Sequence, residues 1–175
     1  MIKGEKIELR ALEPNDIDLL YQWENDLSSW HLSNTLTPFS RFALEQYIMT
    51  ADQDIFTIKQ LRLMIDKIGT NKKICIGAID LFDFDPANKR AGIGIMIDKN
   101  QRNQGFATEA LKLLVQYCFT TLELHQLYCN IEKTNSESLK LFQNQGFEIA
   151  GKKREWVRKN NQWTDEYFLQ LINGC

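Results

Sequence analysis

Apolar side chains recur along this chain at two spacings, which predict strands and helices. Alternating or short continuous apolar runs are typical of strands, and they cover Lys6–Ala11, Gln60–Lys67, Lys73–Phe82, Ala91–Asp98, Leu127–Glu132, Phe147–Arg158 and Trp163–Ile172. Apolar positions three and four residues apart are typical of helices, and they cover Pro14–Glu24, Arg41–Thr50, Thr108–Leu122 and a segment from Asn135 to about Gln145. This order predicts a single α/β (α+β) domain over residues 1–175, with a mixed, mostly antiparallel sheet of about seven strands and four helices.

Small and polar residues mark the ends of several of these elements. Ser40 and Asn135 precede helical segments, where a short polar side chain can accept a hydrogen bond from a free backbone amide. Gly146 fits the C-terminal end of the last helix. Gly69–Asn71 and Asp83–Lys89 separate strand-like runs and predict two turns.

The segment Arg102–Ala107 carries the most information about function. It lies between a predicted strand and a predicted helix, and Gly105 stands within it. The first amides of a helix have no intrahelical partner and lie at the positive end of the helix dipole. Gly105 permits close backbone approach, and the small Ala107 leaves room beside it. The segment therefore predicts a site for a phosphate or pyrophosphate group.

Composition and charge narrow the classes of partner. A hydrophobic content of 43% and a net charge of −2 are ordinary for a globular chain and unlike a general nucleic-acid binder. A basic cluster between Lys152 and Lys159 is interleaved with Trp156 and followed by Trp163. It is either an RNA-facing patch or a solvated hairpin face, and we prefer the second interpretation. No apolar run approaches the ~20 residues of a membrane helix, so neither nucleic acid nor a membrane is an expected partner.

The cysteines predict a reduced, cytoplasmic protein. Cys75, Cys118 and Cys129 lie inside apolar strand or helix patterns, and no two cysteines form a CxxC pair. Free cysteine in such patterns behaves as a small hydrophobic residue. The opening residues lack the apolar core of a signal peptide, which agrees with the same expectation.

Two motifs occur together in this order of elements. They are Arg102-x-x-Gly105-x-Ala107 and Asn135-x-x-Ser138-x-x-Leu141-Phe142-x-x-x-Gly146-Phe147. With this spacing they resemble the GNAT acetyltransferase superfamily, and the resemblance covers roughly residues 7–171. The stretches 5–11 and 78–91 look most like spermidine/diamine acetyltransferases, with ribosomal-protein N-terminal acetyltransferases as a close second.

The resemblance implies that acetyl-CoA is the acetyl donor. Its pyrophosphate would lie on the backbone amides of Arg102, Asn103, Gln104, Gly105, Phe106 and Ala107, with Thr108 opening the helix. The strands at 93–98 and 127–132 would splay apart, and pantetheine would lie between them beside Ile95, Met96 and Ile97. A backbone N–H near Met96 or Ile97 would polarise the thioester carbonyl, as in an oxyanion hole. The helix that follows would contact the cofactor through Asn135, Ser138 and Phe142.

The chemistry that the resemblance implies is direct attack of a neutral primary amine on the acetyl carbonyl, with CoA thiolate leaving. Many relatives carry Tyr, the usual candidate acid, where this chain has Phe142, and many carry Glu where it has Gly92. The thiolate can leave unassisted, because a thiol pKa is only about 8–9. An ammonium of pKa ~10 can lose its proton through water to Asp80 or Asp83, whose alternative roles are a solvated strand end and a turn cap.

Acidic and aromatic residues are candidates for binding the amine. Asp80 and Asp83 form an acidic group that attracts a cation, whereas Asp85 fits a turn opener. Tyr128 faces either the core or the substrate. In GNAT folds the first helix and the loop after it wall the acceptor site, which implies a role for Trp23, Glu24, Asp26, Trp30 and His31. Core packing is the alternative for Trp23.

Three classes of function remain open from the sequence. The first is an acetyl-CoA-dependent N-acetyltransferase whose acceptor is a polyamine, a diamine or a similar small amine, or alternatively a protein N-terminus. The second is a non-catalytic acyl-CoA sensor, which Gly92 and Phe142 keep open, and the third is an RNA-binding protein that uses the basic hairpin. No metal is expected, since the acidic residues and the two histidines lack ligand spacing. Both a monomer and a homodimer are compatible with the pattern.

Overall fold

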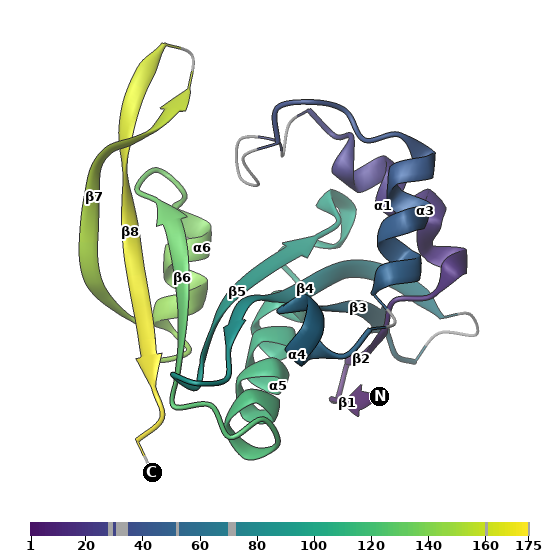
Figure 1. Ribbon diagram of the computed structural model, residues 1–175. Coiled ribbons are helices and arrows are strands. Elements are labelled where there is room, and N and C mark those ends of the chain that lie inside the picture. The colour runs from purple at the N-terminus through teal and green to yellow at the C-terminus, as the bar shows by residue number, and fades with distance from the viewer. Residues whose placement is uncertain (28–29, 31–34, 52, 70–72, 160, 175) are drawn as a thin grey trace. The chain divides into compact units, whose positions relative to one another are not determined.

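A computed structural model describes the chain except residues 28–29, 31–34, 52, 70–72, 160 and 175 (Figure 1). The chain forms two compact units. One comprises Met1–Ala11 and Lys59–Cys175 and contains the sheet, and the other comprises Leu12–Ile58 and contains short helices. We call them the sheet unit and the helical unit.

The sheet unit contains eight strands within its described residues. Their bounds are β1 Ile2–Lys3, β2 Ile7–Ala11, β3 Leu61–Lys67, β4 Ile74–Asp85, β5 Arg90–Ile97, β6 Gln126–Glu132, β7 Glu148–Lys159 and β8 Gln162–Ile172. They form one sheet in the order β1-β2-β3-β4-β5-β6-β8-β7. Neighbouring strands are antiparallel except β5 and β6, which are parallel. The predicted mixed, mostly antiparallel sheet is confirmed.

The parallel strands β5 and β6 pair with each other over only a short stretch. Residues 90–92 of β5 pair with residues 126–128 of β6. Beyond Gly92, β5 continues along β4 to Ile97, whereas β6 continues along β8 to Glu132. Figure 1 shows the two strands diverging from this point. The predicted splay is therefore confirmed, and it leaves two facing strand edges without a strand between them.

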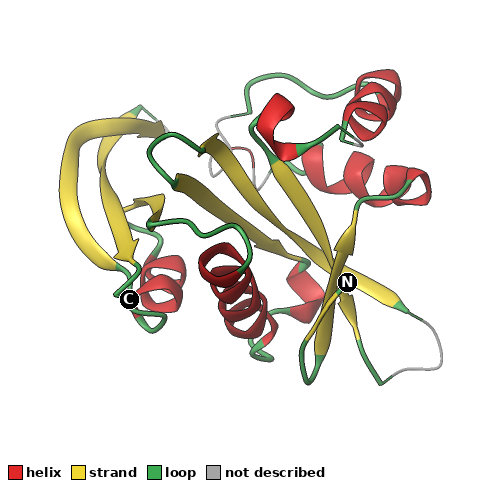
Figure 2. Ribbon diagram, turned by 60° about the horizontal axis from the view of Figure 1, so that its bottom comes forward, coloured by secondary structure: helices red, strands yellow, loops and turns green. Residues whose placement is uncertain are grey.

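The two faces of the sheet differ, because side chains alternate along each strand. One face carries buried aliphatic residues, namely Ile7, Leu9, Ile65, Ile79 and Leu81. Helix α5 (Phe106–Thr120) lies against this face (Figure 2), and the Nζ of Lys67 is 5.3 Å from the ring centroid of Phe106. Alternation places Arg62, Asp80 and Tyr128 on the opposite face, which we call the polar face.

Helix α5 begins two residues earlier than the sequence predicts. Gly105 is its N-cap residue, so Thr108 lies within the first turn and does not open the helix. The next helix, α6 (Ser136–Gln143), starts as predicted after Asn135, whose side chain accepts a hydrogen bond from the Ser138 amide. Local capping signals therefore located α6 better than apolar periodicity located α5.

The helical unit is a small cluster packed around its own apolar residues. Its elements are the 3-10 helix η1 Pro14–Asp16 and the helices α1 Ile17–Glu24, α3 Arg41–Thr50 and α4 Ile55–Ile58. Leu20 of α1 packs against Leu44 and Ile48 of α3. Ser40 caps α3, as predicted, because its hydroxyl accepts from the Ala43 amide. Among the described residues of the chain, no helix is long and apolar enough to cross a membrane.

Other elements also differ from the sequence prediction. Strand β4 continues to Asp85 through a bulge after Phe82, so the turn begins at Pro86 and not at Asp83. Strand β1 and helix α4 are additions, because elements of two and four residues are too short to show a period. The predicted turn at Gly69–Asn71 lies partly outside the described residues.

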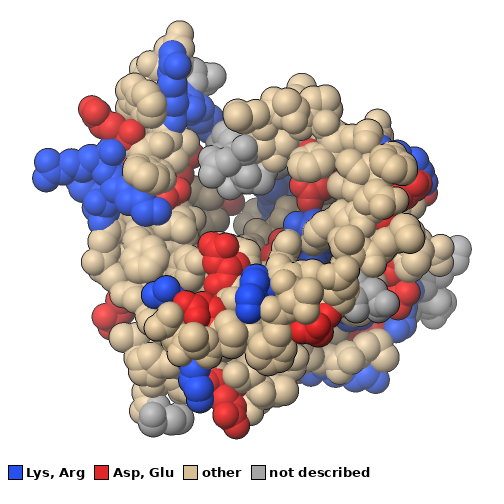
Figure 3. Space-filling view, in the orientation of Figure 1, with Lys and Arg blue, Asp and Glu red and all other residues tan. Residues whose placement is uncertain are grey.

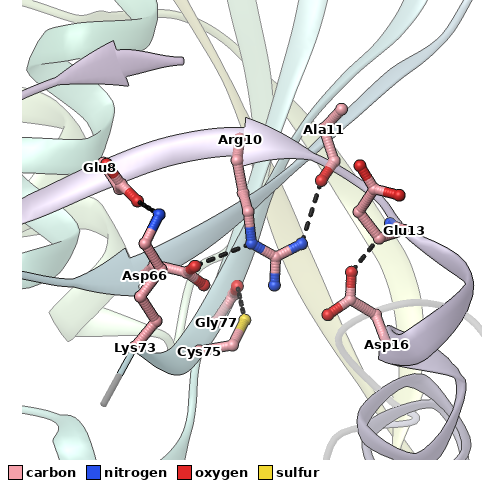
Figure 4. Close-up of polar contacts among 9 residues, drawn as sticks. All are labelled: Glu8, Arg10, Ala11, Glu13, Asp16, Asp66, Lys73, Cys75 and Gly77. Carbon is pink, nitrogen blue, oxygen red and sulfur yellow. Dashed lines mark hydrogen bonds and ion pairs between the residues drawn. The ribbon is translucent and has the colours of Figure 1, made fainter. Parts of the chain in front are cut away.

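Polar contacts join β2 to β3 and to the start of β4 (Figure 4). The Nε of Arg10 donates to Oδ2 of Asp66 at 2.8 Å, and the Asp66 side chain is only 3% exposed. The other oxygen, Oδ1, is buried and has no hydrogen-bond partner within the described part of the chain. Nearby, the Lys73 ammonium donates to Glu8 and lowers the pKa of that carboxyl. The buried charge of Asp66 is therefore balanced by Arg10.

Basic side chains gather over the hairpin of β7 and β8 (Figure 3). Lys152 pairs with Asp165 at 3.3 Å, and Lys153 pairs with Glu166 at 2.8 Å. The Nζ of Lys153 also lies 5.1 Å from the centroid of the exposed Trp156 ring. Because these cations already have partners within the hairpin, the contacts favour a solvated hairpin face over an RNA-facing patch.

The described cysteines are free thiols that differ in burial. Cys118 and Cys129 are 0% and 2% exposed, and burial raises the pKa of each thiol to about 12. The less buried Cys75 donates to the Gly77 carbonyl over 3.6 Å. The prediction that these cysteines fill apolar patterns is thus confirmed for Cys118 and Cys129.

The burial of Asp66 predicts a large effect on stability when Arg10 is removed. Arg10→Ala should lower the free energy of unfolding by about 3 kcal/mol, because it leaves a buried carboxylate without its partner. Arg41→Ala is the matched control, since Arg41 and Asp18 form a pair of the same 2.8 Å length in which both side chains are at least half exposed. That control should change little. Urea unfolding measures both, and equal effects would contradict the role given to burial.

The thiol pKa values predict which cysteines resist labelling. At pH 8 a thiol of pKa 12 is ionised in only about one molecule in ten thousand, so Cys118 and Cys129 should stay unlabelled by a thiol reagent in the native protein. Both should react after unfolding in urea. Mass spectrometry of the labelled peptides tests this, and rapid native labelling of either residue would contradict the burial described here.

Candidate active site

The loop before α5 presents backbone amides that have no helical partner. Gly105 adopts φ of 83° and Asn103 adopts φ of 60°, so both lie in the left-handed region. The first helical amide that has a partner is that of Glu109, which donates to the Gly105 carbonyl at 3.1 Å. The amides of the residues between Gly105 and Glu109 lie at the positive end of α5 and can bind an anion. This geometry agrees with the predicted phosphate site at Arg102–Ala107.

Two lysines lie near this loop, and the sequence does not predict their positions. A Cβ atom added to Gly105 would lie 3.8 Å from the Nζ of Lys6, and the Nζ of Lys67 lies over the Phe106 ring. Lys6 is brought there by the turn before β2, where the amides of Glu5 and Lys6 donate to the carboxylate of Glu109. No local motif could reveal these neighbours, because the contacts join residues that lie far apart in the sequence.

The edge of β5 that faces the splay presents further backbone groups. The Asp98 amide donates to the Ile76 carbonyl on β4 at 2.8 Å. Because successive amides of a strand point to opposite edges, those of Ile97 and Ile95 point toward the splay, whereas that of Met96 points toward β4. Of the two predicted oxyanion donors, the geometry thus favours Ile97. Its carbonyl accepts from the Nε of Arg102 at 3.1 Å, which ties the strand to the loop.

Residues of α6 lie in two different environments. Asn135 is engaged as the helix cap, since its Oδ1 accepts from the Ser138 amide at 3.2 Å. Phe142 is 3% exposed, and its ring packs edge-on against Phe147 at 5.0 Å between centroids. Phe142 is therefore part of the core, and its ring has no proton to give to a leaving group.

The carboxylate of Asp80 is held in a bidentate ion pair on the polar face. Arg62 donates from Nε to Oδ1 at 2.7 Å and from Nη2 to Oδ2 at 3.0 Å. The two side chains are 16% and 21% exposed. Both oxygens of Asp80 thus already accept from one guanidinium, a geometry that fixes the carboxylate in place.

Asp83 and Tyr128 meet on the polar face at the vertex of the splay. The Tyr128 hydroxyl donates to Oδ2 of Asp83 at 3.1 Å. Tyr128 is the register partner of Gly92 in the last pair of β5 and β6. Its ring contacts those of Phe82 and Phe168, with centroids 5.9 Å and 5.5 Å away. From the sequence, the Tyr128 side chain could face either the core or the substrate. In the structure it lies on the polar face.

Gly92 is covered by an aromatic ring. A Cβ atom at this position would lie only 2.2 Å from Cε2 of Phe82. The Phe82 ring occupies the space into which a side chain at position 92 would project. Position 92 is thus covered by a ring from β4, and the hydrogen bond between Tyr128 and Asp83 lies at the same vertex.

Burial and charge keep the Tyr128 hydroxyl protonated. Burial and the neighbouring Asp83 carboxylate raise the pKa of Tyr128 to about 12, and Arg90 acts in the opposite direction. Arg90 is itself paired with Asp85 at 3.2 Å. At neutral pH Tyr128 therefore keeps its hydroxyl proton and donates it in the hydrogen bond to Asp83.

The remaining candidates for the acceptor site belong to the helical unit. The Nε1 of Trp30 donates to the Glu24 carbonyl at 2.8 Å. Trp23 is half-buried, and its Nε1 is buried without a hydrogen-bond partner among the described residues. His31 lies outside the described residues. A contact of Trp23, Glu24 or Trp30 with a substrate stays a prediction.

Known proteins with similar sequences share this architecture. The family described as the acetyltransferase (GNAT) domain matches residues 6–148. The chain is 27% identical to the uncharacterized N-acetyltransferase p20 of Bacillus licheniformis, over 96% of this chain and 93% of that protein. It is 26% identical to spermidine N(1)-acetyltransferase of Escherichia coli K12, over 86% of this chain and 77% of that protein.

A solved structure confirms the fold. Spermidine N-acetyltransferase from Vibrio cholerae, in complex with CoA and spermine, superimposes with a TM-score of 0.86. The match covers 97% of this chain and 96% of that chain at 22% sequence identity. The family match, residues 6–148, spans most of the sequence. The chain therefore belongs to the GNAT acetyltransferase family and is an N-acetyltransferase.

Proposed function

We propose that this enzyme transfers the acetyl group of acetyl-CoA to a primary amine of a polyamine, a diamine or a similar small amine, in the cytoplasm. The observation that carries the proposal is the splay of β5 and β6 beside the amide loop of α5. Relatives named spermidine N-acetyltransferases support the class of acceptor. The free thiols of the described cysteines support a reducing compartment.

Acetyl-CoA fits the unpaired backbone groups of this site. We infer that its pyrophosphate lies on the amides of Arg102–Ala107 and Thr108, near the ammonium of Lys6. The pantetheine arm would then run along the β5 edge, where its amides replace the missing strand and pair with Ile95 and Ile97. We infer that Asn135 and Ser138 line the α6 side of the same site and that Phe142, which packs in the core against Phe147, borders it from below the surface.

Recognition of the amine follows from charge and aromatic rings. An alkyl-ammonium group is attracted by the carboxylates of Asp80 and Asp83 and by the face of the Tyr128 ring. Contacts of Trp23, Glu24 and Trp30 of the helical unit with the amine stay a prediction from the resemblance. For proton removal the candidates are the same two carboxylates, of which Asp80 is already held by Arg62 and Asp83 is bonded only to Tyr128 in the contacts described above.

The acceptor class can be tested by following CoA release with a thiol reagent. The panel contains spermidine, spermine, putrescine, amino-sugar antibiotics, free amino acids and peptides with free N-termini. We expect turnover to be fastest with the polyamines, because they place a second cation near the acidic residues. Turnover of peptides alone would replace the polyamine with a protein N-terminus. Tight binding of acetyl-CoA without turnover of any amine would support the sensor interpretation instead.

The amide loop predicts that Gly105 controls donor affinity. Gly105→Val forces a β-branched residue into φ of 83° and should displace the amides. The Kd for acetyl-CoA should then rise at least about tenfold, since one lost hydrogen bond to a charged group is worth about 1.5–3 kcal/mol. Isothermal titration calorimetry measures the change.

Gly69→Val is the matched control for this variant. Gly69 has φ of 87°, and an added Cβ atom would meet nothing within 4 Å. The control carries similar backbone strain, about 1–3 kcal/mol, without touching the loop. It should leave the Kd unchanged, and an equal loss of affinity in both variants would show that strain alone, and not the loop, explains the result.

A further inference from the structure

Asp83 reaches the polar face because the backbone of β4 is irregular there. Side chains alternate along a strand, so the neighbour of Phe82 would ordinarily point to the α5 face. The register of β4 against β5 shifts between Phe82 and Asp85, and Asp83 adopts φ of 49°. A bulge of this kind turns a side chain toward the opposite face, and bulges are frequent beside active sites. The carboxylate of Asp83 is thereby placed next to Tyr128.

The pair joins the two strands that flank β5. Tyr128 comes from β6 and Asp83 from β4, and β5 with Gly92 lies between these two strands in the sheet. The Phe82 ring fills the space above Gly92 and packs edge-on against the Tyr128 ring. A hydroxyl and a carboxylate from the two flanking strands therefore meet beside the ring that covers Gly92.

We propose that Tyr128 and Asp83 form a proton relay that deprotonates the acceptor amine at the vertex of the splay. The inference rests on the proposed function and assigns its proton-handling groups. Tyr128 is the catalytic residue, because its oxygen contacts the nitrogen of the amine. Asp83 acts through Tyr128 and is the terminal proton acceptor. Asp80, whose two oxygens accept from Arg62, instead attracts and orients the cation.

The relay balances the reaction without a further reagent. The arriving ammonium gives one proton to the oxygen of Tyr128 while the hydroxyl proton of Tyr128 passes to Oδ2 of Asp83. The neutral nitrogen then attacks the acetyl carbon, so that a C–N bond forms and the C–S bond breaks. The second proton of the nitrogen goes to the departing thiolate. Asp83 is exposed and returns its proton to water, which restores the pair.

The charges around Tyr128 explain why it relays a proton and does not act as a permanent base. Its pKa is raised to about 12 by burial and by Asp83 from β4, while Arg90 from β5 lowers it and is paired with Asp85. The hydroxyl is therefore neutral at pH 7 and donates to Asp83. Its free lone pair is left to accept a hydrogen bond from the amine. A neutral tyrosine hydroxyl of this kind transfers a proton only when it receives one from the amine while it gives its own to Asp83.

The relay can be tested by measuring the rate of acetyl transfer between pH 6 and 10. The variants are Tyr128→Phe, Asp83→Asn and the double variant. Tyr128→Phe should lower kcat about 100-fold at pH 7, within the range for one acid–base group, with an unchanged Kd for acetyl-CoA. Without the relay, kcat/KM should rise with pH until the ammonium group of the substrate loses its proton by itself near pH ~10. The wild type should level off at lower pH. Because the two residues act in series, the double variant should be no slower than Tyr128→Phe.

Tyr167→Phe is the matched control, because Tyr167 also stands on the sheet but adjoins Phe168 and so faces the other side. It should keep the wild-type rate and pH profile. A wild-type profile in Tyr128→Phe, or additive losses in the double variant, would overturn the relay while acetylation by the wild type stands. A wild type that acetylates no amine would overturn the proposed function, and the relay with it.

Discussion

Every part of the site depends on the unmet hydrogen-bonding capacity of backbone groups. A strand edge or a helix start that lies inside a protein needs partners for its amides and carbonyls. In this sheet β5 and β6 separate after residues 90–92 and 126–128, and α5 begins with free amides a few residues after β5 ends. The divergence and the loop thus create a continuous run of donors and acceptors. A chain of amides ending in a pyrophosphate has the complementary groups along its length.

At the vertex of the splay, aromatic rings pack around a glycine. With glycine at position 92, the Phe82 ring settles on the backbone and carries the Tyr128 ring against it. The bulge in β4 then turns the Asp83 carboxylate toward the same place. Position 142, which is buried against Phe147, has no part in this arrangement. In the proposed relay the acid–base groups thus come from β4 and β6, the two strands that flank β5.

Local signals in the sequence predicted much of this site. Gly105 before an amphipathic run predicts the amide loop, and Asn135 three residues before Ser138 predicts the cap of α6, because each signal lies within a few residues. The Arg62–Asp80 ion pair, the approach of Lys6 to Gly105 and the direction of Asp83 depend on strand pairing and on a bulge. Periodicity cannot reveal them, since a shift of one residue moves a side chain to the other face.

The open edges of β5 and β6 also link the stability of the fold to the concentration of the ligand that binds there. A ligand that binds only the folded chain adds stability by mass action, about 2.7 kcal/mol at a concentration of 100 Kd. The donor would fill a place that another strand fills elsewhere in the sheet, so it would act as a removable piece of secondary structure. How readily this enzyme unfolds is then set in part by the metabolic supply of its own substrate.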